Sequence, residues 1–276
     1  MKMLSAALLL FVSLCGTGTA GAQDASSLRW QKGPETGVID GRASIVIPKG
    51  YVFLDAAETK KYVEMSHNLS GGNEYLYAPD TGGWEAYFSF NEEGYIKDND
   101  KLDADALLKS IRDSQEQANV ERKQRGWPAF TIVGWQIPPR YNSTTKVLEW
   151  ATVLKEEGSD TTTINYDTRV LGRKGTMGIV LVASPKNFGA GLVAFQDRLG
   201  GFNYNEGDRY ADFRPGDHVA EYGLAALVAG GAAAVAAKKG FFTVIAGFLA
   251  VAWKFMIAGV AALGAWLRSF FRKKAA

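Results

Sequence analysis

The sequence predicts an α+β fold: a curved antiparallel sheet with two or three packing helices, followed by a C-terminal transmembrane helix. Three observations support this prediction. Four strand-like segments follow one another over residues 130–183 without an intervening helix, which is typical of antiparallel neighbours. Segments with helical periodicity come before and after them. An apolar run at residues 241–267 is long enough to cross a bilayer.

The folded part opens with two short strands and a helix. SIVIP (residues 44–48) and YVFL (residues 51–54) show the alternation of β-strands, with a glycine turn between them. Asp55 stands where a helix N-cap is expected, because its side chain can accept a hydrogen bond from the first turn. We therefore predict a helix over residues 56–65 that ends near Asn68.

A hairpin and a longer helix come next. NEYLYAP (residues 73–79) and WEAYFSF (residues 84–90) flank a D-T-G-G turn, and their alternating aromatic rings are expected to fill one side of a sheet. The acidic stretch at residues 98–105 begins a helical pattern, with Asp103 as the N-cap. A calcium loop is the alternative interpretation, but Leu102 stands where an oxygen ligand is needed and Asp103 where a glycine is needed.

The last third of the folded part is rich in strands. Turn sequences, among them Pro138-Pro139, separate four segments with strand patterns: residues 130–137, 146–154, 161–172 and 174–183. We expect these to be consecutive antiparallel strands. A helix over residues 185–199 is expected to cover one face of their sheet. Residues 23–215 would then form one extracytoplasmic α+β domain.

The N-terminus is typical of a cleavable signal peptide. Residues 1–22 carry a basic start, an apolar centre and an Ala-x-Ala site, so cleavage is expected after Ala22. Cys15 follows Leu14, where a lipoprotein signal has a small residue, and this disfavours lipidation. Cys15 is the only cysteine, so the mature chain has no means of forming a disulfide or a cysteine metal site.

The C-terminal segments predict a membrane anchor. Residues 216–240 read as an Ala/Gly-rich juxtamembrane or partly inserted helix, residues 241–267 as a transmembrane helix that contains Lys254, and residues 268–276 as a basic cytoplasmic tail. The tail and the signal peptide agree on one topology, in which the main domain lies outside the inner (cell) membrane, periplasmic or otherwise extracytoplasmic. Two spans in a hairpin and an interfacial arrangement stay open as alternatives.

Composition and motifs argue against several classes of function. A net charge of +2, with basic residues concentrated at the C-terminus, gives no basic surface for nucleic acid. The two histidines, His67 and His218, are too few for a histidine metal site. Ser143 and Lys146 match S-x-x-K but fall in a turn, whereas that chemistry needs a helix N-terminus. We predict no catalytic, cofactor-binding or metal-binding residue and no cofactor.

One polar cluster falls on and after the predicted strand at residues 161–172. Its members are Asn165, Tyr166, Asp167, Arg169 and Arg173. Strand alternation puts Asn165, Asp167 and Arg169 on one face, and Glu149 on the preceding strand is placed to be a cross-strand partner. The cluster could be a binding surface or a carboxylate site. An Asp and an Arg two apart on an exposed strand usually form a solvent-facing pair, and we interpret them as such.

Five stretches of the chain match one family in order. They are IPKGYVFLDAAETKKY, GYIKDNDKLDADALLKSI, GWQIPPRYNSTTKVLEWA, NYDTRVLGRKGTMGIVLVA and RYADFRPGDHVAEYGLAALVAGGAAA. On these stretches the chain resembles the bacterial membrane-anchored proteins of domain-of-unknown-function family 2167. The resemblance implies a signal peptide, an extracytoplasmic domain and a C-terminal anchor, and it carries over no catalytic residues. The strand-rich end with its closing helix is also similar to small envelope and thylakoid-lumen proteins of the PsbP-like type, which implies a fold and no function.

These observations favour a membrane-anchored envelope protein that binds another protein without catalysing a reaction. Lys254 could pair with an acidic residue of an integral-membrane partner, and the charged segment 207–217 suits a linker that docks back on the domain or contacts a partner. A carboxylate-dependent hydrolase or a ligand-binding domain, using Asp167, Glu149 or residues 98–105, is the alternative. A membrane-stress or lipid-sensing module is a third hypothesis.

Overall fold

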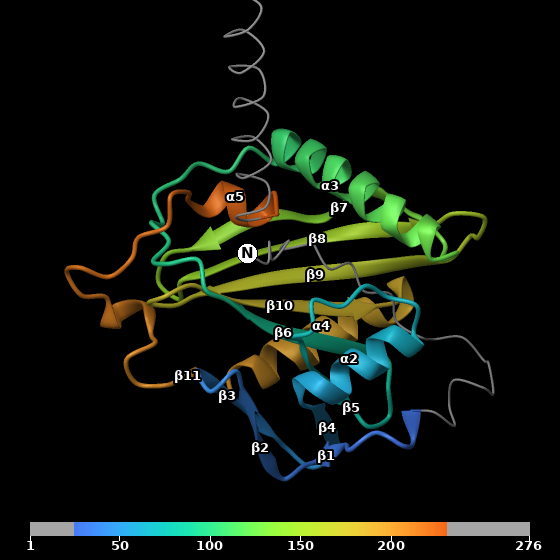
Figure 1. Ribbon diagram of the computed structural model, residues 1–276, viewed down its shortest axis with the longest axis horizontal. Helices are drawn as coiled ribbons and strands as arrows, with labels where there is room; N and C mark the ends of the chain where they lie inside the picture. Colours follow the sequence, from blue (N-terminus) through green and yellow to red (C-terminus); the bar gives the residue numbers. More distant parts are fainter. Residues whose placement is uncertain (1–24, 231–276) are drawn as a thin grey trace, which may run out of the picture. The chain divides into compact units, whose positions relative to one another are not determined.

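A computed structural model describes residues 25–230 of the chain (Figure 1). The predicted signal peptide, the transmembrane segment at residues 241–267 and the basic tail lie outside the described residues. Within residues 25–230, no helix is both long and apolar enough to cross a membrane.

The main sheet has eight strands, and every neighbouring pair in it is antiparallel. In spatial order the strands are β1 (Gln31–Lys32), β4 (Tyr51–Leu54), β5 (Tyr75–Pro79), β6 (Trp84–Asn91), β10 (Thr176–Ala183), β9 (Thr162–Leu171), β8 (Val147–Glu156) and β7 (Phe130–Asn142). The predicted run of four consecutive antiparallel strands is confirmed, as is the hairpin of β5 and β6. The sequence does not reveal that β6 pairs with β10, which places the first strands beside the last ones.

The prediction that Pro138-Pro139 ends a strand is wrong, because β7 continues through both prolines to Asn142. Its pairing with β8 shifts register between Ile137 and Arg140. Proline has no N–H to donate, so it is confined to edge strands and bulges. β7 offers both, since it is the last strand of the sheet and is irregular at this point.

A second, three-stranded sheet contains β2 (Glu35–Ile39), β3 (Ala43–Ile47) and β11 (Phe202–Tyr204), in the order β11-β3-β2. The two segments predicted as strands at residues 44–48 and 51–54 are strands, but they belong to different sheets. The chain changes sheets at the turn between β3 and β4, where Gly50 adopts a φ of 86° that favours glycine. The single predicted sheet is thus a large sheet with a smaller one beside it.

The helices begin where their capping residues predict. Asp55 accepts a hydrogen bond from the Glu58 N–H at 2.9 Å and caps α2 (Ala56–Met65). Asp103 accepts from two N–H groups of the first turn at 3.1 Å and caps α3 (Ala104–Gln124), which confirms the N-cap interpretation. α4 (Pro185–Leu199) has the predicted bounds. The remaining helical pieces are η1 (Tyr210–Asp212) and α5 (Leu224–Val228).

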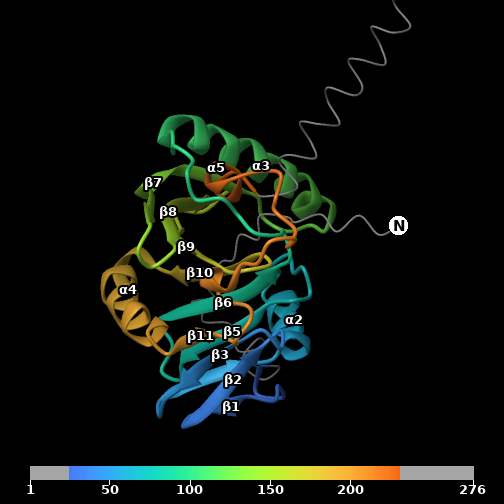
Figure 2. The same cartoon turned by 90° about the vertical axis from the view of Figure 1, so that its left-hand side faces the viewer.

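The two faces of the large sheet are covered differently (Figures 1 and 2). One face, which we call the α4 face, packs on α4 and the small sheet around an aromatic core. There the Trp84 and Phe195 rings meet edge to face at a centroid distance of 5.9 Å. The aromatic positions of β5 and β6 mostly point to this side, as predicted: Tyr77, Trp84, Phe88 and Phe90 belong to this core.

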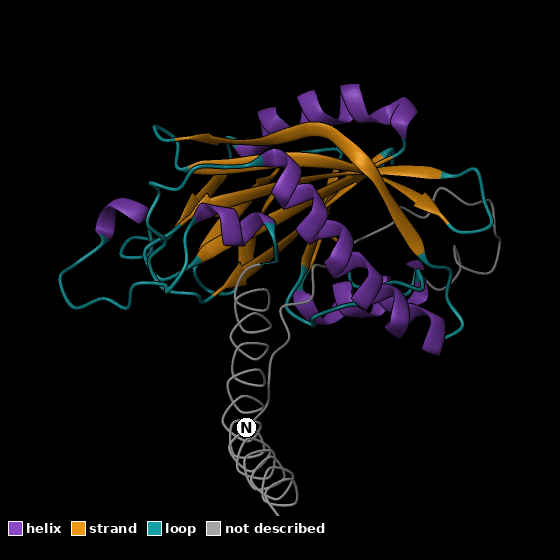
Figure 3. Ribbon diagram, turned by 90° about the horizontal axis from the view of Figure 1, so that it is seen from above, coloured by secondary structure: helices purple, strands orange, loops and turns teal. Residues whose placement is uncertain are grey.

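The opposite face, the α2/α3 face, carries two separate apolar clusters (Figures 1 and 3). α3 packs over β7 and β8, where Leu107 and Ile111 meet Trp150. α2 packs near the other end of the sheet, where Val63 lies with Leu54. α5, within the Ala/Gly-rich segment, contributes Leu224, Leu227 and Val228 to the α3 cluster. The described part of that segment therefore packs on the domain.

We expect Phe195→Ala to lower the free energy of unfolding by about 3–5 kcal/mol, because it empties a fully buried site between Trp84 and Tyr166. Val193→Ala, two residues earlier on the exposed side of α4 at 69% exposure, should change it by no more than about 0.5 kcal/mol. Denaturant unfolding of both variants measures the difference. Similar values for the two would contradict the packing of α4 on this core.

Candidate functional site

The predicted polar cluster lies on β9, an interior strand between β8 and β10. Asn165, Asp167 and Arg169 alternate along it, and their side chains share the α2/α3 face, as predicted. We call these three residues the polar stripe. The interpretation of Asp167 and Arg169 as a solvent-facing pair is wrong, because Asp167 is only 5% exposed and Asn165 is 0% exposed. Their strand lies inside the sheet, and the sequence around β9 does not reveal this.

Arg169 is held in the stripe by three neighbours. Its Nη2 lies 3.2 Å from Asp167 Oδ1, and its guanidinium stacks 4.9 Å from the centre of the Trp150 ring. Gly178 on β10 is the cross-strand neighbour of Arg169, and a Cβ at that position would lie 3.4 Å from Arg169 Nη1. The missing side chain of Gly178 leaves the space in which the guanidinium lies. The ion pair with Asp167 and the stacking on Trp150 therefore fix the Arg169 guanidinium.

Asp167 is a buried carboxyl group with an altered acidity. Burial raises the pKa of Asp167 above its ordinary value, although Arg169 acts in the opposite direction. The register places Trp150 on β8 and Val180 on β10 directly beside it. A general acid or base works with a nucleophile or a second titratable group in hydrogen-bond reach. The two cross-strand neighbours of Asp167 are both apolar, and its ion-pair partner is Arg169.

Asn165 is the unusual member of the stripe. Both its Nδ2 and its Oδ1 are buried without a hydrogen-bond partner. Its cross-strand neighbours are Thr152 on β8 and Val182 on β10, so Asn165 has a paired strand on each side. Nearly all buried polar groups in native proteins are hydrogen-bonded, and an exception calls for an explanation. The sequence places Asn165 on the correct face but carries no signal for this lack of partners.

Tyr166 and Glu149 lie on the opposite, α4 face, so they do not join the polar stripe. The Tyr166 hydroxyl donates a short hydrogen bond to Glu149, whose other oxygen accepts from Arg140. Burial raises the pKa of Tyr166 to about 12, and the hydrogen bond to Glu149 adds to this effect. Glu149 is a cross-strand partner as expected, but of Tyr166 and not of the stripe, because neighbouring residues on a strand point to opposite faces.

The acidic residues at 98–105 have separate roles. Asp98 accepts hydrogen bonds from Lys146 Nζ at 2.8 Å and from the Tyr141 hydroxyl at 2.7 Å, and Asp103 caps α3. Asp100 accepts a long hydrogen bond, at 3.4 Å, from the backbone of Ala225. Over residues 25–230 there is no group of three or more His, Cys, Asp or Glu side chains placed to hold a metal ion.

The other residues singled out in the sequence have local contacts. Ser143 lies in a turn in which Asn142 Oδ1 accepts from the N–H groups of Thr144 and Thr145, as the turn interpretation requires. His67 stacks on Trp127 at a centroid distance of 5.7 Å. The His218 carbonyl accepts from the Tyr95 N–H at 2.8 Å. These contacts are structural.

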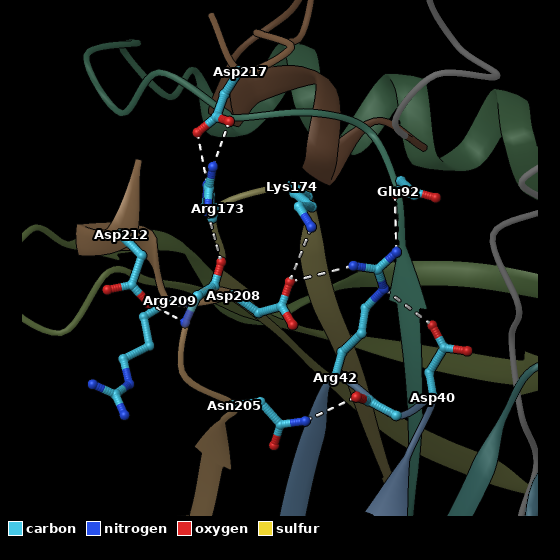
Figure 4. A network of polar contacts seen from close by, with 12 residues as sticks. Asp40, Arg42, Glu92, Arg173, Lys174, Asn205, Asp208, Arg209, Asp212 and Asp217 are labelled. Carbon is cyan, nitrogen blue, oxygen red and sulfur yellow. Dashed lines mark hydrogen bonds and ion pairs between the residues drawn. The ribbon is translucent and has the colours of Figure 1, made fainter. Parts of the chain in front are cut away.

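The charged segment at residues 207–217 docks back on the domain, as predicted, through a network of ion pairs (Figure 4). Arg173 donates two hydrogen bonds of 2.7 Å to the two oxygens of Asp217 and a third, of 3.3 Å, to the Gly207 carbonyl. Bidentate pairing of this kind fixes direction as well as distance. We call this network, together with the contacts of Asp208, the clasp.

Within the clasp, Asp208 links the segment at residues 207–217 to Arg42, which follows β2 of the small sheet. It lies 3.3 Å from Arg42 and 3.8 Å from Lys174, and Arg42 also reaches Glu92 at 2.9 Å. Four separate segments therefore meet here: the turn after β2, the end of β6, the turn after β9 and residues 205–217 (Figure 4). Arg42 and Glu92 carry no signal in the sequence, since their partners are remote along the chain.

Beyond the clasp the chain stays against the domain. The Ala220 N–H donates to the Tyr95 carbonyl at 3.0 Å, and Tyr95 forms a parallel bridge with Val219. Gly94 has a φ of 89°, and a Cβ there would lie 2.4 Å from His218 Nδ1, so only glycine fits this close approach. The clasp thus leads the chain directly to α5.

Comparison with known protein families assigns the chain to one of them. Residues 31–264 match the family described as protein of unknown function (DUF2167), which is most of the chain. The chain belongs to the DUF2167 family. Both the polar stripe and the clasp lie inside the region that matches DUF2167.

Other comparisons add little to the DUF2167 assignment. A search of curated proteins finds no match. Among solved structures, the chain is similar to the solution structure of cyanobacterial PsbP (CyanoP) from Synechocystis sp. PCC 6803, with 11% sequence identity and a TM-score of 0.37. That similarity covers 70% of this DUF2167 chain and 98% of the cyanobacterial one. It is a distant likeness.

In this DUF2167 protein, we expect Arg173→Gln to speed amide exchange across residues 205–217 while the strands of the large sheet keep their protection. The reason is the loss of three hydrogen bonds from one guanidinium. Lys186→Gln is the control, because Lys186 is an exposed residue of α4 and is not a member of the clasp. Hydrogen exchange by mass spectrometry measures both. Equal exchange in the two variants would show that Arg173 does not hold the segment.

The clasp should also depend on pH. Hydrogen bonds from Arg173 and from the Arg214 N–H lower the pKa of Asp217 to about 2. An unfolded carboxyl has a pKa of about 4, so the contribution of Asp217 is complete above that value and is lost as the pH falls through about 2. Exchange of residues 205–217, corrected for intrinsic rates, should therefore accelerate between pH 4 and pH 2. No acceleration in this window would contradict the pairing.

Proposed function

We propose that this protein is a membrane-anchored accessory module of the bacterial cell envelope that binds another protein and does not catalyse a reaction. The observation that carries the proposal is the setting of Asp167, a buried carboxyl between Trp150 and Val180 with Arg169 as its ion-pair partner. Catalytic carboxyls require a second reactive group and access to substrate. Asp167 is 5% exposed and paired with Arg169, which argues against both.

The other candidate carboxyls support the same conclusion. Glu149 accepts hydrogen bonds from Tyr166 and Arg140. Asp98 accepts hydrogen bonds from Lys146 and Tyr141. Both oxygens of Glu149 accept from internal donors, whereas both donors to Asp98 bond to its Oδ2. Donors of this kind stabilise the ionised carboxylate and disfavour uptake of a proton from a substrate. The bonding of Glu149 and Asp98 within the domain supports a binding function over a catalytic one.

Two terminal segments support the proposed location of the module. The signal peptide at residues 1–22 and the basic tail at residues 268–276 support an extracytoplasmic domain on a single span. Lys254 lies within that span, and a lysine near the bilayer centre costs about 2.5–3.5 kcal/mol on insertion scales. An acidic residue in a partner's span would offset this cost. We therefore propose an integral-membrane protein as the partner.

A carboxylate-dependent hydrolase is the second candidate, and the raised pKa of Asp167 is the observation in its favour. Perturbed carboxyls occur at active sites, but they also occur in structural ion pairs. The two candidates differ in what Asp167→Asn would do, because the amide keeps the shape and loses the proton chemistry.

We expect Lys254→Leu to reduce recovery of a specific membrane protein by about tenfold or more after mild crosslinking in cells and affinity purification of the full-length chain. Lys274→Leu, in the basic tail, is the matched control and should leave recovery unchanged. Identification of the copurified proteins by mass spectrometry measures the result. Absence of any specific partner from the unmodified chain, or equal recovery with Lys254→Leu, would contradict the proposed partner.

We further expect Asp167→Asn to retain the copurified partner and any cellular phenotype of the gene. Circular dichroism and thermal unfolding establish that the variant is folded. A folded Asp167→Asn protein that keeps its partner but loses the phenotype would favour the hydrolase.

A further inference from the structure

We infer that residues 219–228, which we call the strap, have two alternative positions: docked on the domain, as in this structure, and released into the membrane interface. The inference uses the membrane anchor of the proposed function but does not depend on a protein partner. It starts from α5, whose three largest apolar side chains are buried: Leu224 is 1% exposed, Leu227 3% and Val228 0%.

The docked position is defined by backbone as well as side-chain contacts. Tyr95 and Val219 form a parallel bridge, and the Ala220 N–H donates to the Tyr95 carbonyl at 3.0 Å. The buried side chains of α5 join the apolar cluster that contains Leu107 and Ile111 of α3. Figure 1 shows α5 beside the N-terminal part of α3. The strap is therefore docked through specific contacts.

α5 is too short to be a stable helix by itself. It has five residues, and isolated helices shorter than about 12–15 residues are marginal in water. At its start, Asp100 Oδ2 lies 3.4 Å from the Ala225 nitrogen, which is a long hydrogen bond. The helix thus persists because its apolar side chains are packed on the domain. It can be released when those side chains find another apolar environment.

The bilayer offers such an environment to the same side chains. Residues 222–237 form an apolar stretch whose only aliphatic residues larger than alanine are Leu224, Leu227, Val228 and Val235. Leucine and valine favour transfer into the membrane, and in the docked strap all of these except Val235 are buried in the domain. Entry into the membrane would in turn remove them from the α3 cluster. The two positions therefore exclude each other.

Under the proposed topology, the strap is tethered close to the membrane. Residues 231–240 separate the described part of the chain from the predicted span at residues 241–267, and ten residues extend over no more than about 33–36 Å. In the released position, residues 222–237 lie in the interface together with Lys238 and Lys239, which anionic headgroups attract. Anionic lipid is therefore expected to favour release.

Release changes the surface of the domain. Leu107 and Ile111 of α3 share a cluster with the apolar side chains of α5, and they lose those neighbours when the strap leaves. Apolar patches exposed in this way mark interaction sites. The lipid composition of the membrane then controls whether this apolar surface is covered.

The test uses the full-length mature protein in lipid nanodiscs. Its only cysteine, Cys15, lies in the predicted signal peptide, so engineered cysteines can be spin-labelled specifically. Labels at Ala226→Cys in the strap and at Val193→Cys on the exposed side of α4 report their separation by double electron–electron resonance. One set of nanodiscs contains phosphatidylcholine alone, and the other contains phosphatidylcholine and phosphatidylglycerol in equal amounts.

We expect one separation to predominate in phosphatidylcholine, and a second, released population to be at least about threefold larger with phosphatidylglycerol. Leu107→Ala should raise the ratio of released to docked protein about tenfold, because it removes apolar contact from the docked position only. Val120→Ala, at a 58% exposed position of α3, is the matched control and should leave the ratio unchanged. Asp100→Ala, which leaves the core intact, should shift the ratio in the same direction as Leu107→Ala.

The label at Ala226→Cys also reports where the released strap lies. Its accessibility to oxygen should rise, and its accessibility to a water-soluble nickel complex should fall, as the released population grows. Three outcomes would overturn the inference: a single unchanged separation in both lipid mixtures, equal ratios in Leu107→Ala and Val120→Ala, and a released strap that stays accessible to the nickel complex. Copurification tests the protein-binding function separately, because none of these measurements requires a partner.

Discussion

The structure depends on one constraint: β9 is an interior strand of an antiparallel sheet whose two faces are both covered. Successive residues on such a strand point to opposite faces, so the polar side chains at residues 163–168 of β9 are withdrawn from water on one side or the other. Tyr166 meets this requirement by bonding Glu149 on the α4 face, and Asp167 meets it by pairing with Arg169 on the other. Asn165 does not meet it at either side-chain atom, and neither does the Thr168 hydroxyl.

The parts of the fold that could be predicted are those set by contacts between residues close in sequence. Asp55 and Asp103 fix helix starts through bonds to N–H groups two or three residues later, and the bounds of α4 follow from Pro185 at its first turn. The last four strands are joined by short turns, so their order follows from the chain order.

The remaining features depend on contacts between distant residues. β6 pairs with β10 across more than eighty residues, and Arg42 meets Asp208 across 166. No local pattern signals either contact. The candidate site could be predicted only in part. Strand alternation groups Asn165, Asp167 and Arg169 on one face correctly, but their burial depends on strands and helices elsewhere in the chain. The solvent-facing interpretation failed because it treated β9 as an exposed strand.

The two prolines of β7 have a consequence for association. An edge strand presents unpaired backbone groups to which another chain can add a strand, and proteins commonly block such edges. β1, at one border of the large sheet, has only two residues, and β7, at the other, lacks two N–H groups at Pro138 and Pro139 and is irregular beside them. Neither border is a good template for intermolecular β-pairing. Other chains are thereby directed away from the rims of the sheet, and self-association through them is suppressed.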